Sequence, residues 1–198
     1  MARLPRQAID AAGFETKFQD NIDPWNYAGS RFEAFKRSVL LQACGHRPYA
    51  RGLELACAIG ETTKALRPLC LNLLALDASP TALEEAQRRT ANLTRVEFRQ
   101  GLLPDDLPSG TFDLIVASEI VYYLPPRDME RLLIGLKQRL AAGGRIVLLH
   151  HTRDFGDAAF RPSMAQAHCV HFLGQSMVLR MRRNTMQFQA VAFEARKR

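Results

Sequence analysis

The pattern of apolar positions divides the chain into alternating strands and helices. Short apolar segments typical of strands lie at residues 52–57, 71–77, 95–99, 112–117 and 145–150. The fourth is a continuous apolar run, as expected of a central strand in a parallel sheet. Amphipathic helical segments begin near residues 61, 79 and 127. This order, with short loops, predicts a parallel sheet with right-handed crossover connections.

Several helix ends are marked by individual residues. Ser30 and Glu33 form a capping box ahead of a helix that is predicted to run to about Gly45. Ser79 followed by proline predicts an N-cap with Pro80 at the first helical position, and that helix should reach about residue 91. The glycine pair at 143–144 predicts a left-handed C-cap for the helix that begins near residue 127.

The pattern changes after residue 150. Residues 156–173 are predicted to be helical, and alternating segments at about 175–182 and 186–195 flank a hairpin turn at 183–184. We therefore expect one domain over residues 1–198, with an N-terminal segment and helix in residues 1–45. Its fold class is α/β: a Rossmann-like, mostly parallel seven-stranded sheet with an antiparallel C-terminal hairpin and helices on both faces.

Composition excludes several classes of protein. The 198 residues suit a single domain, and no apolar run approaches the roughly 20 residues that span a membrane. The N-terminus has no signal-peptide core, so we expect a cytoplasmic protein with no membrane partner. The four cysteines lack C-x-x-C spacing, which predicts buried reduced thiols; no metal is expected.

The net charge of +7 is concentrated near the C-terminus and raises the question of a nucleic-acid partner. No aromatic residues alternate with these arginines to stack on bases, which favours a solvated face on an edge hairpin instead. Nucleic acid is therefore not the expected partner, and the sequence does not specify an oligomeric state.

A cofactor site is predicted beyond the carboxyl ends of the strands, where open α/β sheets bind ligands. The loop after the first strand runs from Glu54 to Gly60, and domains that bind S-adenosylmethionine (SAM) usually have an acidic residue and G-x-G-x-G there. Here Ala56 and Ala58 replace the first two glycines. A dinucleotide fingerprint would need glycine where Glu61 stands, and that carboxylate would repel a pyrophosphate. The spacing therefore favours SAM.

Further cofactor contacts are expected after the next strands. Asp77 ends the second strand, where a carboxylate can accept hydrogen bonds from both ribose hydroxyls; an ordinary Asp ahead of a helix is the alternative. Gly101 lets the backbone approach the adenine edge. The remaining predicted cofactor residues are Ala78, Ser79, Gln100, Leu102 and Ser118.

Four segments together resemble the family of the nodulation methyltransferase NodS: Asp23–Tyr27, Leu53–Gly60, Leu76–Ser79 and Phe112–Leu124. The resemblance implies SAM-dependent N-methylation of the free amine of an amino sugar or oligosaccharide, such as a partly deacetylated chitooligosaccharide, with S-adenosylhomocysteine (SAH) as product. It also implies that Trp25 and Tyr27 cover the cofactor. From the residues alone, these two side chains are more typical of a core.

Methyl transfer to an amine requires a group that takes a proton. Glu119, after the fourth strand, is the first candidate, and it would also orient an ammonium by charge; a surface glutamate without a role is the alternative. Tyr122 is a candidate for a wall or a substrate hydrogen bond. Because side chains alternate along a strand, only one of His150 and His151 can face the site, and we expect His151.

Two other functions remain open at this level. A methyltransferase could act on another small molecule or on nucleic acid, although the negative charge of Glu119 suits a cationic amine better than a base or a phosphate. Alternatively, the missing glycines at 56 and 58 fit a non-catalytic binding module with the same fold.

Overall fold

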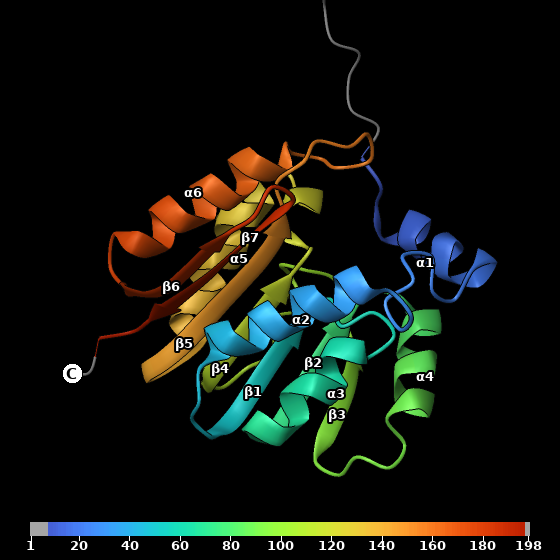
Figure 1. Ribbon diagram of the computed structural model, residues 1–198, viewed down its shortest axis with the longest axis horizontal. Coiled ribbons are helices and arrows are strands. Elements are labelled where there is room, and N and C mark those ends of the chain that lie inside the picture. The colour runs from blue at the N-terminus through green and yellow to red at the C-terminus, as the bar shows by residue number, and fades with distance from the viewer. Residues whose placement is uncertain (1–7, 197–198) are drawn as a thin grey trace, which may run out of the picture.

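A seven-stranded sheet forms the centre of the computed structural model, which describes residues 8–196 (Figure 1). The strand order is β3-β2-β1-β4-β5-β7-β6, and β7 runs antiparallel to both β5 and β6. The strands are β1 (Tyr49–Leu55), β2 (Cys70–Asp77), β3 (Val96–Gln100), β4 (Phe112–Ser118), β5 (Leu140–His151), β6 (Val178–Asn184) and β7 (Phe188–Glu194). The first five are mutually parallel where they pair, which confirms the predicted fold class.

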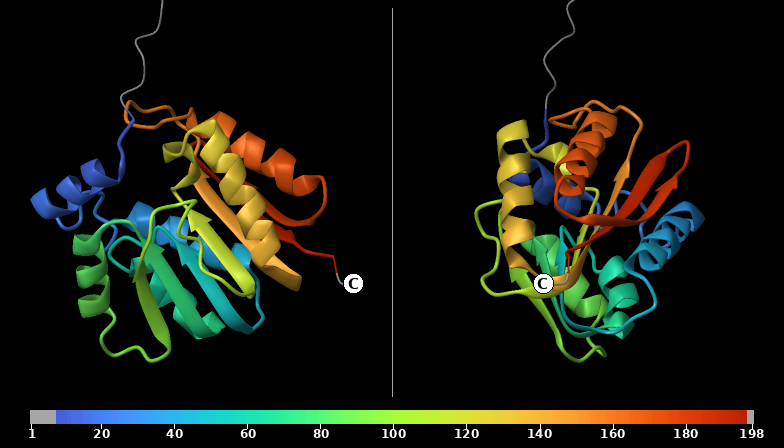
Figure 2. Two further views of the ribbon diagram at one scale, coloured as in Figure 1. Left: turned by 180° about the vertical axis from the view of Figure 1, so that it is seen from behind. Right: turned by 90° about the vertical axis from the view of Figure 1, so that its left-hand side faces the viewer.

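Helices cover both faces of the sheet (Figures 1 and 2). They are α1 (Ala11–Asp20), α2 (Arg31–Cys44), α3 (Glu61–Leu66), α4 (Pro80–Arg89), α5 (Pro126–Arg139) and α6 (Pro162–Gly174), with 3₁₀ turns η1 (Arg67–Leu69) and η2 (Val121–Tyr123). On one face α2 and α3 bury Val39, Leu40 and Leu66 against the sheet. On the other, α5 and α6 bury a larger apolar cluster that includes Leu132, Leu136 and Cys169.

The starts of two helices follow the predicted caps, one of them only in part. The Ser79 hydroxyl accepts the Ala82 N–H at 3.0 Å, and the Ser30 hydroxyl accepts the Glu33 N–H at 3.3 Å. The reciprocal half of the capping box is wrong, because the Ser30 N–H donates to a main-chain carbonyl, that of Asn26. The Glu33 carboxylate instead forms an ion pair with Lys36, one turn further along α2.

Three predicted boundaries are wrong, each for a local reason. Helix α5 ends at Arg139 and β5 includes Gly143 and Gly144, so the glycine pair is not a helix cap; Gly143 does have a left-handed φ of 69°. The hairpin turn follows Asn184 rather than containing it, since the Thr185 hydroxyl accepts the N–H groups of Gln187 and Phe188. Helix α6 begins only at Pro162, where proline fits the first helical turn.

The four cysteines are free and buried, as predicted. Within residues 8–196, none of the helices has both the length and the apolar character needed to cross a membrane.

The N-terminal helix α1 lies beside α4, above the edge of the sheet where the parallel strands end (Figure 1). The Glu15 carboxylate fixes it there by accepting hydrogen bonds from the hydroxyls of Ser79 and Thr81, at 2.6 and 2.5 Å. At the other end, the Ile9 N–H donates to the carbonyl of Asp157 in the loop after β5, at 3.0 Å. Helix α1 therefore bridges the loop after β2 and the loop after β5.

Candidate functional site

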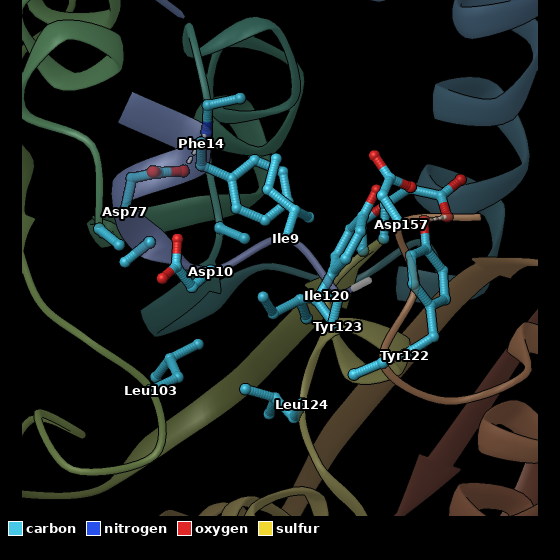
Figure 3. Close-up of a pocket in the computed structure, with 18 of the residues that line it drawn as sticks. Ile9, Asp10, Phe14, Asp77, Leu103, Ile120, Tyr122, Tyr123, Leu124 and Asp157 are labelled. Atoms are coloured by element: carbon cyan, nitrogen blue, oxygen red, sulfur yellow. Dashed lines mark hydrogen bonds between the residues drawn. The ribbon is translucent and has the colours of Figure 1, made fainter. Parts of the chain in front are cut away.

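A cavity of about 770 Å³ lies beyond the carboxyl ends of the parallel strands, beneath α1. Figure 3 shows Asp77 on one side of it and Tyr122 and Tyr123 on the other, with Ile9 and Phe14 of the N-terminal segment between them. Neighbouring strands are about 4.8 Å apart, so the ends of β2 and β5, three steps apart in the sheet, are separated by roughly 14 Å. A ligand in this cavity can therefore extend across four strands.

Most of the predicted site residues line this one cavity. From the predicted cofactor set these are Trp25, Tyr27, Ala56, Asp77, Ala78, Gly101, Leu102 and Ser118, and from the predicted catalytic set Glu119, Tyr122 and His151. Four predicted cofactor residues do not line it: Glu54, Gly60, Ser79 and Gln100.

Two of these four support the loop after β1 from behind. Glu54 is buried and accepts a hydrogen bond from the Thr63 hydroxyl at 2.6 Å; burial raises the pKa of this carboxyl to about 8. Gly60 has a φ of 82°, and a Cβ there would meet Ala86 of α4 at 3.1 Å. Its glycine is therefore required by backbone conformation and by packing against α4.

The other two hold the loop after β2. Ser79 is fully buried, caps α4, and donates its hydroxyl hydrogen to Glu15 of α1. The side-chain amide of Gln100 donates to the carbonyl of Ala78 at 3.2 Å. Both residues therefore contact the loop after β2 and do not line the cavity.

Asp77 organises the backbone at the cofactor side of the cavity. Its carboxylate accepts the N–H of Ala58 at 2.8 Å and the N–H of Ser79 at 3.0 Å. Burial raises the pKa of Asp77, while these N–H groups oppose that rise. Ala56 and Ala58 have φ values of 54° and 47°, so the loop keeps the left-handed conformation that glycine favours despite having none at these positions.

Glu119 is held by three donors at the opposite side of the cavity. Its Oε1 accepts from the Lys36 ammonium at 2.6 Å, and its Oε2 accepts from the Tyr122 hydroxyl at 2.6 Å and from the His151 N–H at 2.9 Å. Burial by itself would raise the pKa of Glu119, but the positive charge of Lys36, with the nearby histidines, lowers it overall. A carboxylate so well paired is a weak proton acceptor.

His151 is better placed to take a proton. Its Nδ1 lies 3.1 Å from the main-chain carbonyl of Gln187, and its Nε2 lies 3.5 Å from the Lys36 Nζ. Because a carbonyl only accepts hydrogen bonds, this network assigns the proton to Nδ1 and the lone pair to Nε2. The imidazole is thus oriented by its far nitrogen, as in general bases whose tautomer is fixed by a neighbouring acceptor.

The neighbouring histidine has a structural position. His150 is completely buried, with Nδ1 2.7 Å from Gln166 Oε1 and Nε2 accepting the Val121 N–H at 3.4 Å. Burial lowers the pKa of His150 to about 4. Of the two histidines, His151 lines the cavity and His150 does not.

Lys36 is the residue of this cluster that the sequence analysis missed. It is only 5% exposed, and its ammonium also pairs with Glu33 at 3.1 Å. The available signal was its position on the apolar face of α2, between Phe32 and Val39 at helical spacing. A lysine on a face that packs inward needs a partner, but only the folded chain shows which one.

Aromatic side chains cover the cavity from the N-terminal side. Phe14 packs edge-on against Tyr123, with ring centroids 4.7 Å apart, and lies 6.1 Å from the Trp25 ring. Trp25 and Tyr27 also pack in a small apolar cluster with Phe18. The two expectations for Trp25 and Tyr27 are therefore compatible, because one ring can pack in this cluster and line the cavity at once.

Carboxylates outnumber cations on the described lining of the cavity, which has eight carboxylates and two cations, Lys36 and Arg153. Much of this negative charge is compensated by ion pairs: Glu33 and Glu119 pair with Lys36, Asp105 and Asp128 with Arg131, Asp154 with Arg161, and Asp157 with Lys17. The lining is therefore acidic in composition but largely paired in charge. The carboxylates are Asp10, Glu33, Asp77, Asp105, Glu119, Asp128, Asp154 and Asp157.

Residues 53–146 match the family described as a methyltransferase domain. Among curated proteins, nodulation protein S of Rhizobium tropici is 33% identical over 127 residues, which are 63% of this chain and 53% of that protein. The chain spans about half the length of the curated nodulation proteins that it matches.

Solved structures agree on the fold. The N-methyltransferase NodS from Bradyrhizobium japonicum WM9, in complex with S-adenosyl-L-homocysteine, superimposes with a TM-score of 0.78 at 22% identity, covering 91% of this chain and 97% of that one. A putative methyltransferase from Pseudomonas syringae gives a TM-score of 0.72 at 27% identity, covering 83% and 99%.

Proposed function

We infer that this chain, which is a NodS-like class I methyltransferase domain in sequence and fold, transfers a methyl group from SAM to the nitrogen of a small amine. The observation that carries this proposal is one cavity with two chemically different ends. The Asp77 carboxylate, which ends β2 and accepts an N–H of the left-handed loop after β1, lies at one end. The His151 imidazole, with Nδ1 held by the Gln187 carbonyl and Nε2 3.5 Å from the Lys36 ammonium, lies at the other.

The residues at the Asp77 end fit the cofactor. Asp77 lines the cavity, and each carboxylate oxygen that accepts one backbone N–H retains a second lone pair for a ribose hydroxyl. Gly101 lines the cavity, and a Cβ there would meet Asp106 at 3.0 Å, so glycine is favoured at this position by close packing against Asp106. Ala78, Leu102 and Ser118 would complete the contacts. Bound there, SAM would supply a methyl on cationic sulfur, with the N–C bond forming as the S–C bond breaks and its electron pair stays on sulfur.

The chain itself would position the amine and remove its proton. His151 Nε2 accepts that proton, and the carbonyl of Gln187 holds the ring in place through Nδ1. Glu119 fixes Tyr122 and the main chain of His151 rather than acting as the base, which revises the order of the two candidates. Helix α1 and its aromatic side chains exclude water from the reacting atoms.

The acceptor we propose is an amine because carboxylates outnumber cations on the cavity lining and His151 is placed to act as a base. The resemblance to the NodS family supports the amine of an amino sugar or oligosaccharide. A nucleic-acid acceptor is disfavoured, since a lining with more carboxylates than cations is poorly suited to a phosphate backbone. We place the reaction in the cytoplasm, as the sequence predicts.

Mass spectrometry of a partly deacetylated chitooligosaccharide, incubated with the protein and SAM, tests the proposal. We expect one added methyl on the free amine and none on the fully acetylated sugar. The His151→Gln variant should lose most of this activity, whereas His168→Gln, a matched change on the exposed face of α6, should retain it.

Other results would change the assignment in defined ways. SAM binding without product would reject the amino sugar and direct the search to other amines. No SAM binding would reject the enzyme and favour the non-catalytic module.

A further inference from the structure

A buried lysine is the central charge of the acceptor end of the cavity. The Lys36 ammonium lies 2.6 Å from Glu119 Oε1, 3.1 Å from Glu33 Oε2 and 3.5 Å from His151 Nε2. It comes from α2, whereas Glu119 follows β4 and His151 ends β5. Three elements distant in sequence therefore bring one ammonium, two carboxylates and one imidazole together.

An internal ammonium at this place has a chemical consequence for an amine acceptor. A carboxylate without a partner in a buried site binds a protonated amine and stabilises its charged form. A protonated amine has no lone pair, so it cannot attack a methyl group. Lys36 already occupies the Oε1 side of Glu119, and this leaves no unpaired carboxylate there to hold the acceptor as an ammonium.

We propose that Lys36 is a positioning residue that neutralises Glu119 and so makes the acceptor nitrogen bind as the free amine, with its proton given to His151. This inference rests on the proposed function and adds the protonation state in which the substrate is bound. In the step proposed, the proton moves from the acceptor nitrogen to His151 Nε2, and the nitrogen keeps its lone pair. The Lys36–Glu119 pair would thus select the uncharged form.

The pH dependence of this step involves all groups that face Glu119 and His151. Helix α2 contributes Glu33 and Lys36, and the turn after β4 contributes Tyr122 and Tyr123. Strand β5 and the loop after it contribute His150 and Arg153, and the segment before α2 contributes Tyr27. Lys36 is the group among them with a fixed charge in direct contact with both Glu119 and His151.

Lys36→Met tests the inference through the pH–rate profile. The variant leaves Glu119 free to pair with a protonated acceptor, so kcat at pH 7 should fall at least tenfold while the acceptor KM does not rise. The rising limb of the profile should move to higher pH by about one unit or more, the scale on which a neighbouring charge changes proton binding. An unchanged profile would overturn the inference.

Three further variants separate this effect from a folding defect. Because Lys36 pairs with both Glu33 and Glu119, Lys36→Met combined with Glu33→Gln and Glu119→Gln leaves neither carboxylate unpaired, and this triple variant should return the profile to within about half a pH unit of wild type. Lys36→Arg retains the charge and should keep the wild-type profile. Lys137→Met makes the same chemical change on α5, where the lysine lies over the Phe172 ring outside the cavity, and should change nothing.

A binding measurement tests the same point without catalysis. Tetramethylammonium is a permanent cation that cannot give up a proton, and its affinity for the SAH-bound protein can be followed by calorimetry. Lys36→Met should bind it at least tenfold more tightly than wild type, and the triple variant with Glu33→Gln and Glu119→Gln should not. Equal affinities would overturn the inference. If wild type methylates no amine but this difference appears, the proposed function fails and the charge selection by Lys36 stands.

Discussion

Replacing Asp77 by asparagine would separate cofactor binding from loop stability. The change keeps the size of the side chain but removes its charge and one of its acceptor oxygens. Asp77 accepts the backbone N–H groups of Ala58 at 2.8 Å and Ser79 at 3.0 Å, so one of them would face an amide NH₂ in the variant. Losing a charged acceptor and leaving one donor unpaired should destabilise the protein by about 2–4 kcal/mol.

Asp77→Asn should weaken cofactor binding by more than the loss of loop stability alone would explain. Asparagine cannot accept from two ribose hydroxyls as the carboxylate can, and a lost hydrogen bond to a charged group is worth about 1.5–3 kcal/mol. We therefore expect the Kd for SAH, measured by calorimetry, to rise by roughly 10- to 100-fold. Thermal unfolding of the ligand-free protein gives the stability term separately.

Asp113 offers a matched control. Its carboxylate also accepts two backbone N–H groups, those of Ala50 and Arg51, both at 2.7 Å, but at the amino end of the sheet. Asp113→Asn should lower stability to a similar degree and leave the Kd for SAH unchanged. If Asp77→Asn bound SAH within twofold of wild type, or if both variants lost affinity equally, the assignment of Asp77 to the ribose would be refuted.

Two other predictions concern the loop after β1. Ala58→Gly should raise the melting temperature by about 1–3 °C. Glycine avoids the penalty of roughly 1–2 kcal/mol that alanine has at a left-handed φ of 47°, and the greater entropy of the unfolded glycine chain cancels only part of this gain. The control variant Ala82→Gly, inside α4, should lower the melting temperature. Glu54 has a folded pKa of about 8, above its unfolded value, so its contribution to stability is complete at low pH and is lost as pH rises toward 8. The stability of Glu54→Gln relative to wild type should therefore rise steadily between pH 5 and 8, by on the order of a few kcal/mol in the free energy of unfolding. Melting temperatures of both proteins across this range measure the change. A difference in melting temperature that stays constant with pH would contradict the buried-acid explanation.

Local chemistry in the sequence determined most of the fold. Apolar runs and helical spacing predicted the order of strands and helices, since each period matches the geometry of one element. Ser79 with Pro80 marked the start of α4 because a cap involves only the next few residues. The prediction of a helix end at the glycine pair 143–144 was wrong, because a left-handed residue is equally suited to the irregular start of a long strand.

The general position of the cavity also followed from the sequence. Residues at the carboxyl ends of parallel strands must meet at one edge, and this rule alone places Asp77, Ser118 and Glu119 together. Strand alternation then chose His151 over His150. These inferences needed only the connectivity of the sheet and the direction of successive side chains.

Only the tertiary structure decided which groups are partners. Lys36 is separated from Glu119 by 83 positions and from His151 by 115, and no local pattern links them. Glu33 was expected to cap its own helix, but a buried ammonium one turn away offered a stronger charged partner than a main-chain N–H. A charge that leaves water must find its counter-charge within a few ångströms. The packing of α2 against β5 and β7 sets that distance.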